Sequence, residues 1–457
     1  MIPRLSPPAG LGRERDAFAF GRGDRRRPLR ILVDTATVDS GHAYECLRDF
    51  SHHPSLEILM FEGGAHPATI TPDRTMPGLF HVEFVIDSRT TRAAVWAHDY
   101  LEVARATSAD VAEAEAGIVV AAAAEQITCD VVATQSAYLL SGAPRSLVKR
   151  ANPVSPEDAA ALVGLYLRLD GDFSIDYGKE WKDALGRHFS YFVLMRELLP
   201  AAWRWFSGCM AHSASGGDED LAMIAQSGME RVDRALRARD RLHGELQQPS
   251  GLETIEEALF YFDVTLLMLG GAFDVTALVA DAVHGLNTPP HRVSWASTDW
   301  LRKTGQTNQT LARLMIPGQP SRDARELVAV LRNTIHGQSM GTISYQASGR
   351  PREQLIVLPK SVESKFEQLI HRQPHASAFG VERLPSQHLS VDPGCYIEAL
   401  FPRALAALSA IMDATPVERL AGVDATKLMT GPPQEETFDN IFHPAIRKRL
   451  RLLAGFA

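Results

Sequence analysis

The pattern of apolar residues changes at Pro153-Val154-Ser155-Pro156, and this change most limits the folds open to the chain. Before it, short apolar runs alternate with alanine-rich, helix-like segments; the runs lie near residues 29–34, 56–60, 80–86 and 130–133. Such alternation is typical of a largely parallel sheet covered by helices. After it, apolar residues recur at the three- and four-residue spacing of helices. The sequence therefore predicts an α/β N-terminal domain followed by a mostly α-helical C-terminal region.

Length and breaks in composition indicate how the chain is divided. Its 457 residues are enough for roughly two or three domains, each with its own core. We expect a flexible basic arm at residues 1–28, the α/β domain at 29–150, a helical linker region at 151–250, a helical domain at 251–416 and a tail at 417–457. The tail carries a basic patch, Arg447-Lys448-Arg449-Leu450-Arg451.

Charge and cysteine content exclude several classes of protein. The net charge is −8, so a nucleic acid would have to be bound by a local patch of basic residues rather than by the whole surface. The four cysteines are far apart in the sequence and include no C-x-x-C pair. They argue against a zinc ribbon or a disulfide framework and are compatible with a reducing, cytoplasmic location.

The apolar segments do not meet the requirements of secretion or membrane insertion. The first 30 residues lack the apolar core of a signal peptide. Residues 258–280 form the most apolar stretch, but Asp263 and Asp274 interrupt it, and a carboxylate near the bilayer centre costs about 2.5–3.5 kcal/mol. We therefore expect a buried core helix, or two helices broken at Gly270-Gly271, and no membrane contact.

The segment from Ser321 to Gln338 is predicted to be a helix with one apolar side. Ser321 is a suitable N-cap residue. Leu327, Leu331 and Ile335 follow at intervals of four residues, so their side chains would form a stripe that faces a core. The polar residues near the end of this helix would then lie beside a well-packed surface.

Arg332 and His336 are four residues apart on this predicted helix, so they would share one face. Gly337 is suited to ending the helix, and a histidine in the last turn can titrate near neutral pH, as acid–base catalysis requires. Together with Asn333, these residues resemble the signature of the HEPN superfamily of helical proteins. In that family the polar residue that follows the arginine is usually farther from the histidine. Here only Thr334 and Ile335 separate Asn333 from His336.

The resemblance covers about residues 250–415 and implies a helical bundle with metal-independent endoribonuclease activity, acting as a dimer without a cofactor. In such a reaction the 2′-hydroxyl of the RNA attacks the phosphate, which requires a base, an acid and nearby positive charge. His336 would serve as base or acid, and Arg332 would bind phosphate oxygens. Asn333 would orient the phosphate or the histidine.

Other arginine–histidine pairs occur, so the spacing by itself is a weak signal. Arg239-Asp240-Arg241-Leu242-His243-Gly244 repeats both the spacing and the trailing glycine, and two looser pairs occur at residues 92–98 and 383–388. Because the 239–244 segment is rich in Arg and Asp, we interpret it as a solvated helix face. We prefer Arg332 and His336 as the catalytic pair. In the structural alternative, the arginine packs on the bundle and the histidine completes the end of the helix, and the sequence pattern would be the same.

Acidic residues mark the ends of the predicted N-terminal strands. Asp34 ends the first strand, where α/β sheets place their sites, and Glu115 opens an alanine-rich helix that leads to a strand ending in Thr134. This arrangement resembles PIN-like nuclease domains, which hold one or two Mg²⁺ or Mn²⁺ ions with clustered carboxylates. The resemblance implies Asp34 and Glu115 as metal ligands, whereas Ser136 stands where the family has an acid.

Further residues leave the composition of a metal site open. Asp39, Asp110 and Glu113 could complete a degenerate acidic cluster, although their spacing does not require it. In the structural alternative, Asp34 caps a turn and Glu115 serves the helix N-terminus. The N-terminal histidines are irregularly spaced, so a zinc site made from them is not expected.

These patterns favour an RNA-cleaving protein with its active site on the Arg332–His336 helix, in a stress or defence setting that only the resemblances suggest. The alternative is a non-catalytic regulator or scaffold, in which the α/β domain binds RNA or a nucleotide and the bundle only dimerises. The serine at position 136 and the shortened motif favour this alternative. Growth arrest on overexpression, relieved by His336→Ala, would favour the enzyme.

We predict a homodimer held mainly through residues 250–415, because a bundle with one motif in each chain needs a second copy to build a composite cleft. Light scattering at micromolar concentration should report twice the mass of one chain. A monomer under these conditions would exclude a composite active site.

Overall fold

The chain forms two compact units in the computed structural model. The structure describes residues 16–18, 27–62, 70–96, 111–140, 152–180, 182–248, 251–345, 353–431 and 444–455. The N-terminal unit comprises residues 6–186, 246–250 and 445–457, and the helical unit comprises residues 187–245 and 251–444. The segment 151–250, predicted to be a linker region, is therefore divided between the two units.

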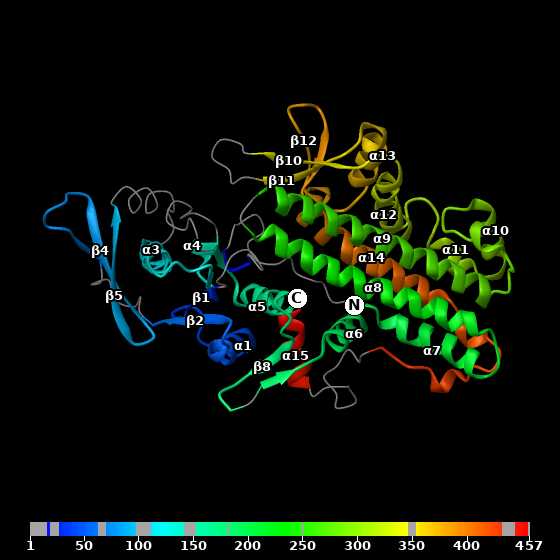
Figure 1. Ribbon diagram of the computed structural model, residues 1–457, viewed down its shortest axis with the longest axis horizontal. Coiled ribbons are helices and arrows are strands. Elements are labelled where there is room, and N and C mark those ends of the chain that lie inside the picture. Colours follow the sequence, from blue (N-terminus) through cyan, green and yellow to red (C-terminus); the bar gives the residue numbers. More distant parts are fainter. Residues whose placement is uncertain are drawn as a thin grey trace. The chain divides into compact units, whose positions relative to one another are not determined.

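The N-terminal unit is built on a sheet with the strand order β3-β4-β2-β1-β6-β7, in which β5 also pairs with β4 (Figure 1). Four strands are parallel: β1 (Leu29–Asp34), β2 (Leu56–Phe61), β6 (Val131–Ala133) and β7 (Asn152–Val154). Three are antiparallel: β3 (Ile70–Pro72), β4 (Leu79–Ile86) and β5 (Arg89–Trp96). The α/β class is confirmed, but the sheet is mixed rather than largely parallel.

A tight hairpin explains the antiparallel half of the sheet. Asp87 and Ser88 join β4 to β5, and their φ angles are 46° and 62°. Two successive residues with positive φ form the turn whose twist matches that of paired strands, and Asn or Gly commonly occupies it. An Asp-Ser pair lacks this usual composition, so the local sequence did not indicate a hairpin.

Helices bury both sides of the parallel strands. On one side, α3 (Val111–Gln126) packs its alanine-rich surface against a core that includes Leu32 of β1. On the other, α1 (His42–Asp49) and α5 (Pro156–Asp170) contact each other, and α5 also contacts β1 and β6. Ile31 and Val33, which alternate with Leu32, are also fully buried. Burial of alternate residues on both faces holds β1 rigidly at the centre of the unit.

The segment predicted to be a flexible basic arm is partly ordered where the structure describes it. Phe18 is fully buried and meets the ring of Tyr166 edge-on, with ring centroids 5.4 Å apart. Arg27 forms an ion pair with Asp130 at 2.5 Å. Residues 1–15 and 19–26 lie outside the described residues. The arm prediction is therefore wrong for Phe18 and Arg27, because both contribute to the packing of the N-terminal unit.

The predicted basic patch of the tail also belongs to the N-terminal unit. It lies on α15 (Pro444–Leu453), where Arg447 is only 7% exposed. Arg449 forms ion pairs with Asp49, at 2.8 Å, and with Asp176. The patch is therefore not a solvated basic surface, because two of its arginines are used inside the unit.

The second unit is mostly helical, as predicted, and its long helices lie side by side (Figure 1). The described helices of this unit, long and short, are α6 (Arg187–Leu198), α7 (Pro200–Ala214), α8 (Glu219–Leu246), α9 (Leu252–Val283), α10 (Thr298–Thr307), α11 (Gln309–Arg313), α12 (Pro320–Gly337), α13 (Lys360–His371) and α14 (Pro393–Ala414). The core is centred on Tyr396, whose ring contacts Phe262, Phe366 and Phe379 with centroid distances of 5.6–5.7 Å. Aromatic packing around Tyr396 thus joins α9, α13 and α14.

A small antiparallel sheet accompanies these helices, with the strand order β10-β11-β13-β12. The strands are β10 (Gly341–Tyr345), β11 (Glu353–Val357), β12 (Val381–Arg383) and β13 (Leu389–Val391). β11 carries the short apolar run Leu355-Ile356-Val357, which is the clearest strand signal of the four in the sequence. The other three strands are short or polar and carry little alternating pattern, so they were not predicted.

The most apolar stretch of the chain forms one continuous helix, α9, that passes through Gly270-Gly271 without a break. By length and composition alone, α9 and the segment 393–419 are each suited to crossing a membrane. In both, 67% of the most apolar window is buried inside the unit, as in the core helices of globular proteins. This burial agrees with the expected core helix.

Candidate functional site

The parallel strands create a switch point at the carboxyl edge of the N-terminal sheet. From β1 the chain passes to β2 on one side, and it later returns to β6 on the other side of β1. Loops after such neighbouring strands turn away from each other, and α/β proteins bind ligands in the crevice that results. Asp34 ends β1 and Thr134 directly follows β6, so both lie at this crevice.

Asp34 is held tightly at one of its two oxygens. The side chain is buried, and Oδ2 accepts hydrogen bonds from the hydroxyls of Thr37 and Thr134, each at 2.8 Å. These hydroxyls accept in turn from the backbone N–H groups of Gln135 and Ser136, both at 3.0 Å. Oδ1 of Asp34 has no hydrogen-bond partner within the described residues. The carboxylate is thus fixed in orientation, while Oδ1 is buried without a partner among the described residues.

Glu113 on the first turn of α3 is the second acid at this crevice. Its Oε1 accepts hydrogen bonds from Oγ of Ser136, at 3.2 Å, and from the N–H of Tyr138, at 3.1 Å. Gly117, one turn later on α3, permits this approach, because an added Cβ would lie 2.5 Å from the Tyr138 ring. Close packing of α3 therefore brings Glu113 to the carboxyl edge of the sheet.

Glu115, the predicted metal ligand, does not line this cavity. The α3 residues that do are Glu113, Ala116, Gly117 and Val120, which have the spacing of a single helix face. Glu115 lies two positions from Glu113 and so points to another side of the helix. Asp39 is exposed and bonds to Ser40, and Asp110 lies outside the described residues. Of the sequence-derived candidates, the structure brings Asp34 and Glu113 together.

The composition of the cavity suits a divalent cation. Its volume is about 230 Å³, and its lining includes two carboxylates and the hydroxyls of Thr37 and Ser136. Mg²⁺ and Mn²⁺ prefer oxygen ligands, and Mg²⁺ is often held by one or two carboxylates together with water and substrate phosphates. No group of three His, Cys, Asp or Glu side chains suited to a metal occurs within the described residues. Asp34 and Glu113 would therefore supply part of the coordination, and water or substrate the rest.

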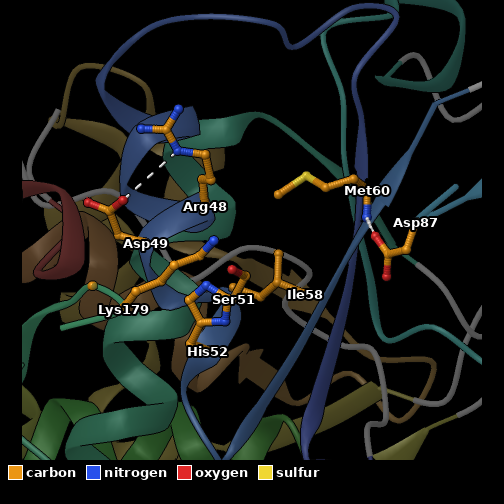
Figure 2. Close-up of a pocket in the computed structure, with 9 residues that line it drawn as sticks. Arg48, Asp49, Ser51, His52, Ile58, Met60, Asp87 and Lys179 are labelled. Carbon is orange, nitrogen blue, oxygen red and sulfur yellow. Dashed lines mark hydrogen bonds and ion pairs between the residues drawn. The ribbon is translucent and has the colours of Figure 1, made fainter.

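A larger hollow of about 590 Å³ lies elsewhere in the N-terminal unit, between α1, β2 and the loop after β8 (Ser174–Tyr177) (Figure 2). It is lined by the basic side chains of Arg48, His52 and Lys179, all of which are exposed. The opposite wall carries Asp87, whose Oδ1 accepts a hydrogen bond from the N–H of Met60 at 2.9 Å. Exposed charges of both signs are well solvated, so this hollow is a weaker candidate than the cavity at Asp34.

Arg332 lies on α12 with its side chain 29% exposed, and its Nη1 is 2.9 Å from Oδ2 of Asp274 on α9. Asn333 is exposed. The backbone of His336 lies in the last turn of α12, but its side chain lies outside the described residues. The structure therefore places Arg332 and Asn333 at the surface of the helical unit and leaves the Arg332–His336 pairing a prediction.

The helix that carries this motif differs slightly from its predicted form. Leu327 and Leu331 of the apolar stripe are fully buried, as expected. The N-cap is Gln319 rather than Ser321, because Pro320 occupies the first helical position, where its missing N–H costs nothing. Gly337 is the last helical residue.

The second copy of the motif is buried rather than solvated. Arg239 is 3% exposed and His243 is 0% exposed. Glu398 of α14 accepts hydrogen bonds from Nε and Nη2 of Arg239, at 2.6 and 2.9 Å, and lies 2.6 Å from Nε2 of His243. The interpretation of this segment as a solvated face is wrong, because the distant Glu398 supplies the compensating charge.

Opposing effects act on the buried Glu398. Burial would raise the pKa of its carboxyl, but Arg239 and His243 outweigh burial and leave the pKa below its usual value. The carboxylate is therefore charged in the folded protein, and this charge stabilises the buried guanidinium of Arg239. The Arg239–His243 pair is a structural cluster of the bundle.

Comparison with protein-family models, with curated proteins and with solved structures found no match to this chain. The HEPN-like and PIN-like resemblances therefore remain predictions that rest on the motifs and on the geometry of the residues that carry them.

Removal of the carboxylate at Glu398 should destabilise the helical unit strongly. Glu398→Gln would remove the carboxylate that binds the buried guanidinium of Arg239 at 2.6 and 2.9 Å, and breaking a buried pair in this way costs about 3 kcal/mol or more. The free energy of unfolding, from urea denaturation at pH 7, measures this loss. Glu418→Gln is the control, since its pair with Arg204 is exposed and should contribute about 0.5 kcal/mol. Equal effects of the two substitutions would contradict the structural role.

Asp263 on α9 should make stability depend on pH. Burial raises its pKa to about 6, and its Oδ1 has no partner among the described residues. A raised pKa gives stability that is full below about pH 4 and is lost as the pH rises through about 6. Asp263→Asn should therefore raise the unfolding free energy by about 1 kcal/mol at pH 7.5, because partial exposure screens the charge, and should change it little at pH 4. An equal change at both pH values would show that the effect is not electrostatic.

Proposed function

We propose that this protein cleaves RNA and that its N-terminal unit does so with a divalent cation held by Asp34 and Glu113. The observation that carries the proposal is the buried carboxylate of Asp34, whose Oδ1 lacks a partner in the described part of the chain. A buried charged oxygen without a donor is costly, and a cation in the adjoining cavity would remove that cost.

The residues around the cavity would have distinct roles. Thr37 and Thr134 fix Asp34 through Oδ2, so that Oδ1 can bind the ion without reordering the side chain. Ser136 and the N–H of Tyr138 fix Glu113 in the same way. When bound, a divalent cation would neutralise phosphate charge and lower the pKa of a bound water, which is the chemistry that phosphodiester hydrolysis needs.

The size of the cavity favours a polymer as substrate. A volume of about 230 Å³ is below the roughly 300–1,000 Å³ of typical small-molecule sites. It suits a hydrated ion and one phosphate group, while the nucleotides on either side would lie outside. The similarity of the Asp34 and Thr134 arrangement to PIN-like nucleases supports RNA as that polymer, and the crevice at the switch point supports a site there.

A second candidate is metal-independent cleavage at Arg332, Asn333 and His336. The partly exposed guanidinium of Arg332 supports it, because its Nη1 contacts Asp274 while the side chain stays accessible from solvent. In this mechanism the 2′-hydroxyl attacks, and the product carries a 2′,3′-cyclic phosphate. Hydrolysis at Asp34 would instead leave a 5′-phosphate.

One cleavage assay distinguishes these mechanisms. Purified full-length protein should cleave labelled single-stranded RNA with Mg²⁺ or Mn²⁺, lose activity in EDTA and leave 5′-phosphate ends. Asp34→Asn should reduce the rate at least 100-fold, since it removes the charged ligand but keeps the shape of the side chain. Asp39→Asn is the matched control, because Asp39 is an exposed acid on the same loop, and its activity should stay within twofold.

Metal binding gives a readout that does not depend on activity. Calorimetry with Mn²⁺ should detect a site that Asp34→Asn weakens at least tenfold and Asp39→Asn leaves unchanged. Cleavage that survives EDTA, gives cyclic phosphate ends and is lost in Arg332→Ala would move the active site to the helical unit. RNA binding without cleavage under either condition would favour the non-catalytic regulator.

A further inference from the structure

Two arginines from different helices lie directly against the backbone of α9. An added Cβ at Gly270 would lie 2.6 Å from Cδ of Arg332, which comes from α12. An added Cβ at Gly271 would overlap Nη1 of Arg231, which comes from α8. The absence of a Cβ at Gly270 and Gly271 thus lets two arginine side chains lie on consecutive residues of one helix.

The packing of α8 on α9 fixes the position of Arg231. Gly228 lies one turn before Arg231, and an added Cβ there would lie 2.8 Å from Cγ1 of Val275 on α9. The two helices therefore approach closely at Gly228 and Val275. One turn away along each helix, Arg231 meets Gly271, and its Cδ would lie 3.1 Å from a Cβ added there. This preorganised stem reduces the side-chain entropy that binding a ligand would cost.

Near Gly270-Gly271, the arginine side chains carry more positive charge than the neighbouring acids can neutralise. Arg332 pairs with Asp274, and Asp274 is also the acid with the largest effect on Arg325, two turns earlier on α12. Glu326 is already paired with Arg322, at 2.8 Å. Arg231 and Arg325 have no hydrogen-bond partner within the described residues, although both are half-buried.

Half-buried guanidinium groups usually have partners, because each carries five N–H donors and loses hydration when it leaves water. Burial lowers the pKa of Arg325, and the neighbouring Arg322 and Arg332 lower it further, against the effect of Asp274. Arg325 and Arg332 share the charge of Asp274, which pairs directly with Arg332. The side chain of Asp274 is also 49% exposed, so water weakens its effect. An anion would satisfy the remaining donors.

We propose that Arg231, Arg325 and Arg332 form a binding site for backbone phosphates of single-stranded RNA on the helical unit. The choice of RNA rests on the proposed function, whereas the anion site rests on the arginines themselves. Arginine binds phosphate through two parallel N–H···O bonds, and the stems of Arg231 and Arg332 are held against the glycine backbone here. Asp274 competes with the phosphate for Arg332 and so sets the affinity of the site.

The test measures binding of fluorescein-labelled single-stranded RNA to the full chain by anisotropy, in EDTA, so that the Asp34 cavity takes no part. Arg231→Gln/Arg325→Gln should weaken binding at least tenfold and reduce the slope of log K against log salt by about 0.7 for each phosphate that the variant no longer neutralises. Arg234→Gln is the matched control, because Arg234 is exposed on the same helix and pairs with Glu230 at 3.1 Å. It should change binding less than twofold.

Asp274→Asn supplies a change in the opposite direction, which a loss of folding cannot imitate. Removing the competing carboxylate should tighten RNA binding at least threefold and leave the salt slope at or above that of the parent. Binding in EDTA reports on the arginine site, and calorimetry with Mn²⁺ reports on the Asp34 cavity, so failure of the metal proposal and failure of this one give different results.

Three results would overturn the proposal. They are parental binding by Arg231→Gln/Arg325→Gln, equal losses in that variant and in Arg234→Gln, and weaker binding by Asp274→Asn. Thermal stabilisation by millimolar inorganic phosphate, lost in the double variant but without RNA binding by the parent, would show a site for a small phosphorylated ligand and would exclude RNA.

Discussion

A charged side chain that leaves water needs an opposite charge or a set of donors, and this requirement organises both units. In the helical unit, the buried Glu398 is satisfied by Arg239 and His243, which join α8 to α14. In the N-terminal unit, Asp34 is satisfied at Oδ2 by two threonine hydroxyls and lacks a partner at Oδ1 in the described part of the chain. In the N-terminal unit, a buried carboxylate oxygen without a donor identifies a place where a ligand would lower the free energy.

The same reasoning separates the two arginine–histidine motifs. Arg239 and His243 have the composition of a catalytic pair, but a dedicated carboxylate occupies the arginine fork and holds both side chains inside the bundle. Arg332 has one described ion-pair partner, Asp274, and the charge of Asp274 also acts on Arg325. The motif that looked solvated is therefore part of the core, and the accessible arginines are the ones able to meet an anion.

Close approaches at glycines position the functional side chains in both units. Gly117 lets α3 reach Tyr138 and so sets Glu113 at the carboxyl edge of the sheet. Gly270 and Gly271 seat arginines on α9 in the helical unit. These glycines have ordinary helical neighbours in the sequence, so the need for them becomes visible only once the facing helix is in place.

The sequence by itself determined the class of each region, the helix that carries Arg332 and the strand-end position of Asp34, because these follow from local periodicity and composition. The choice of Glu113 over Glu115 was not in the sequence, because α3 is alanine-rich and apolar on all sides and either acid has small or apolar residues three and four positions later. Only the tertiary structure decided the hairpin between β4 and β5, the joining of α15 to the N-terminal unit and the burial of Arg239 and His243. Each of these depends on a partner or a packing surface that the local sequence does not specify, and local pattern carries no record of which distant charge or surface a segment will meet.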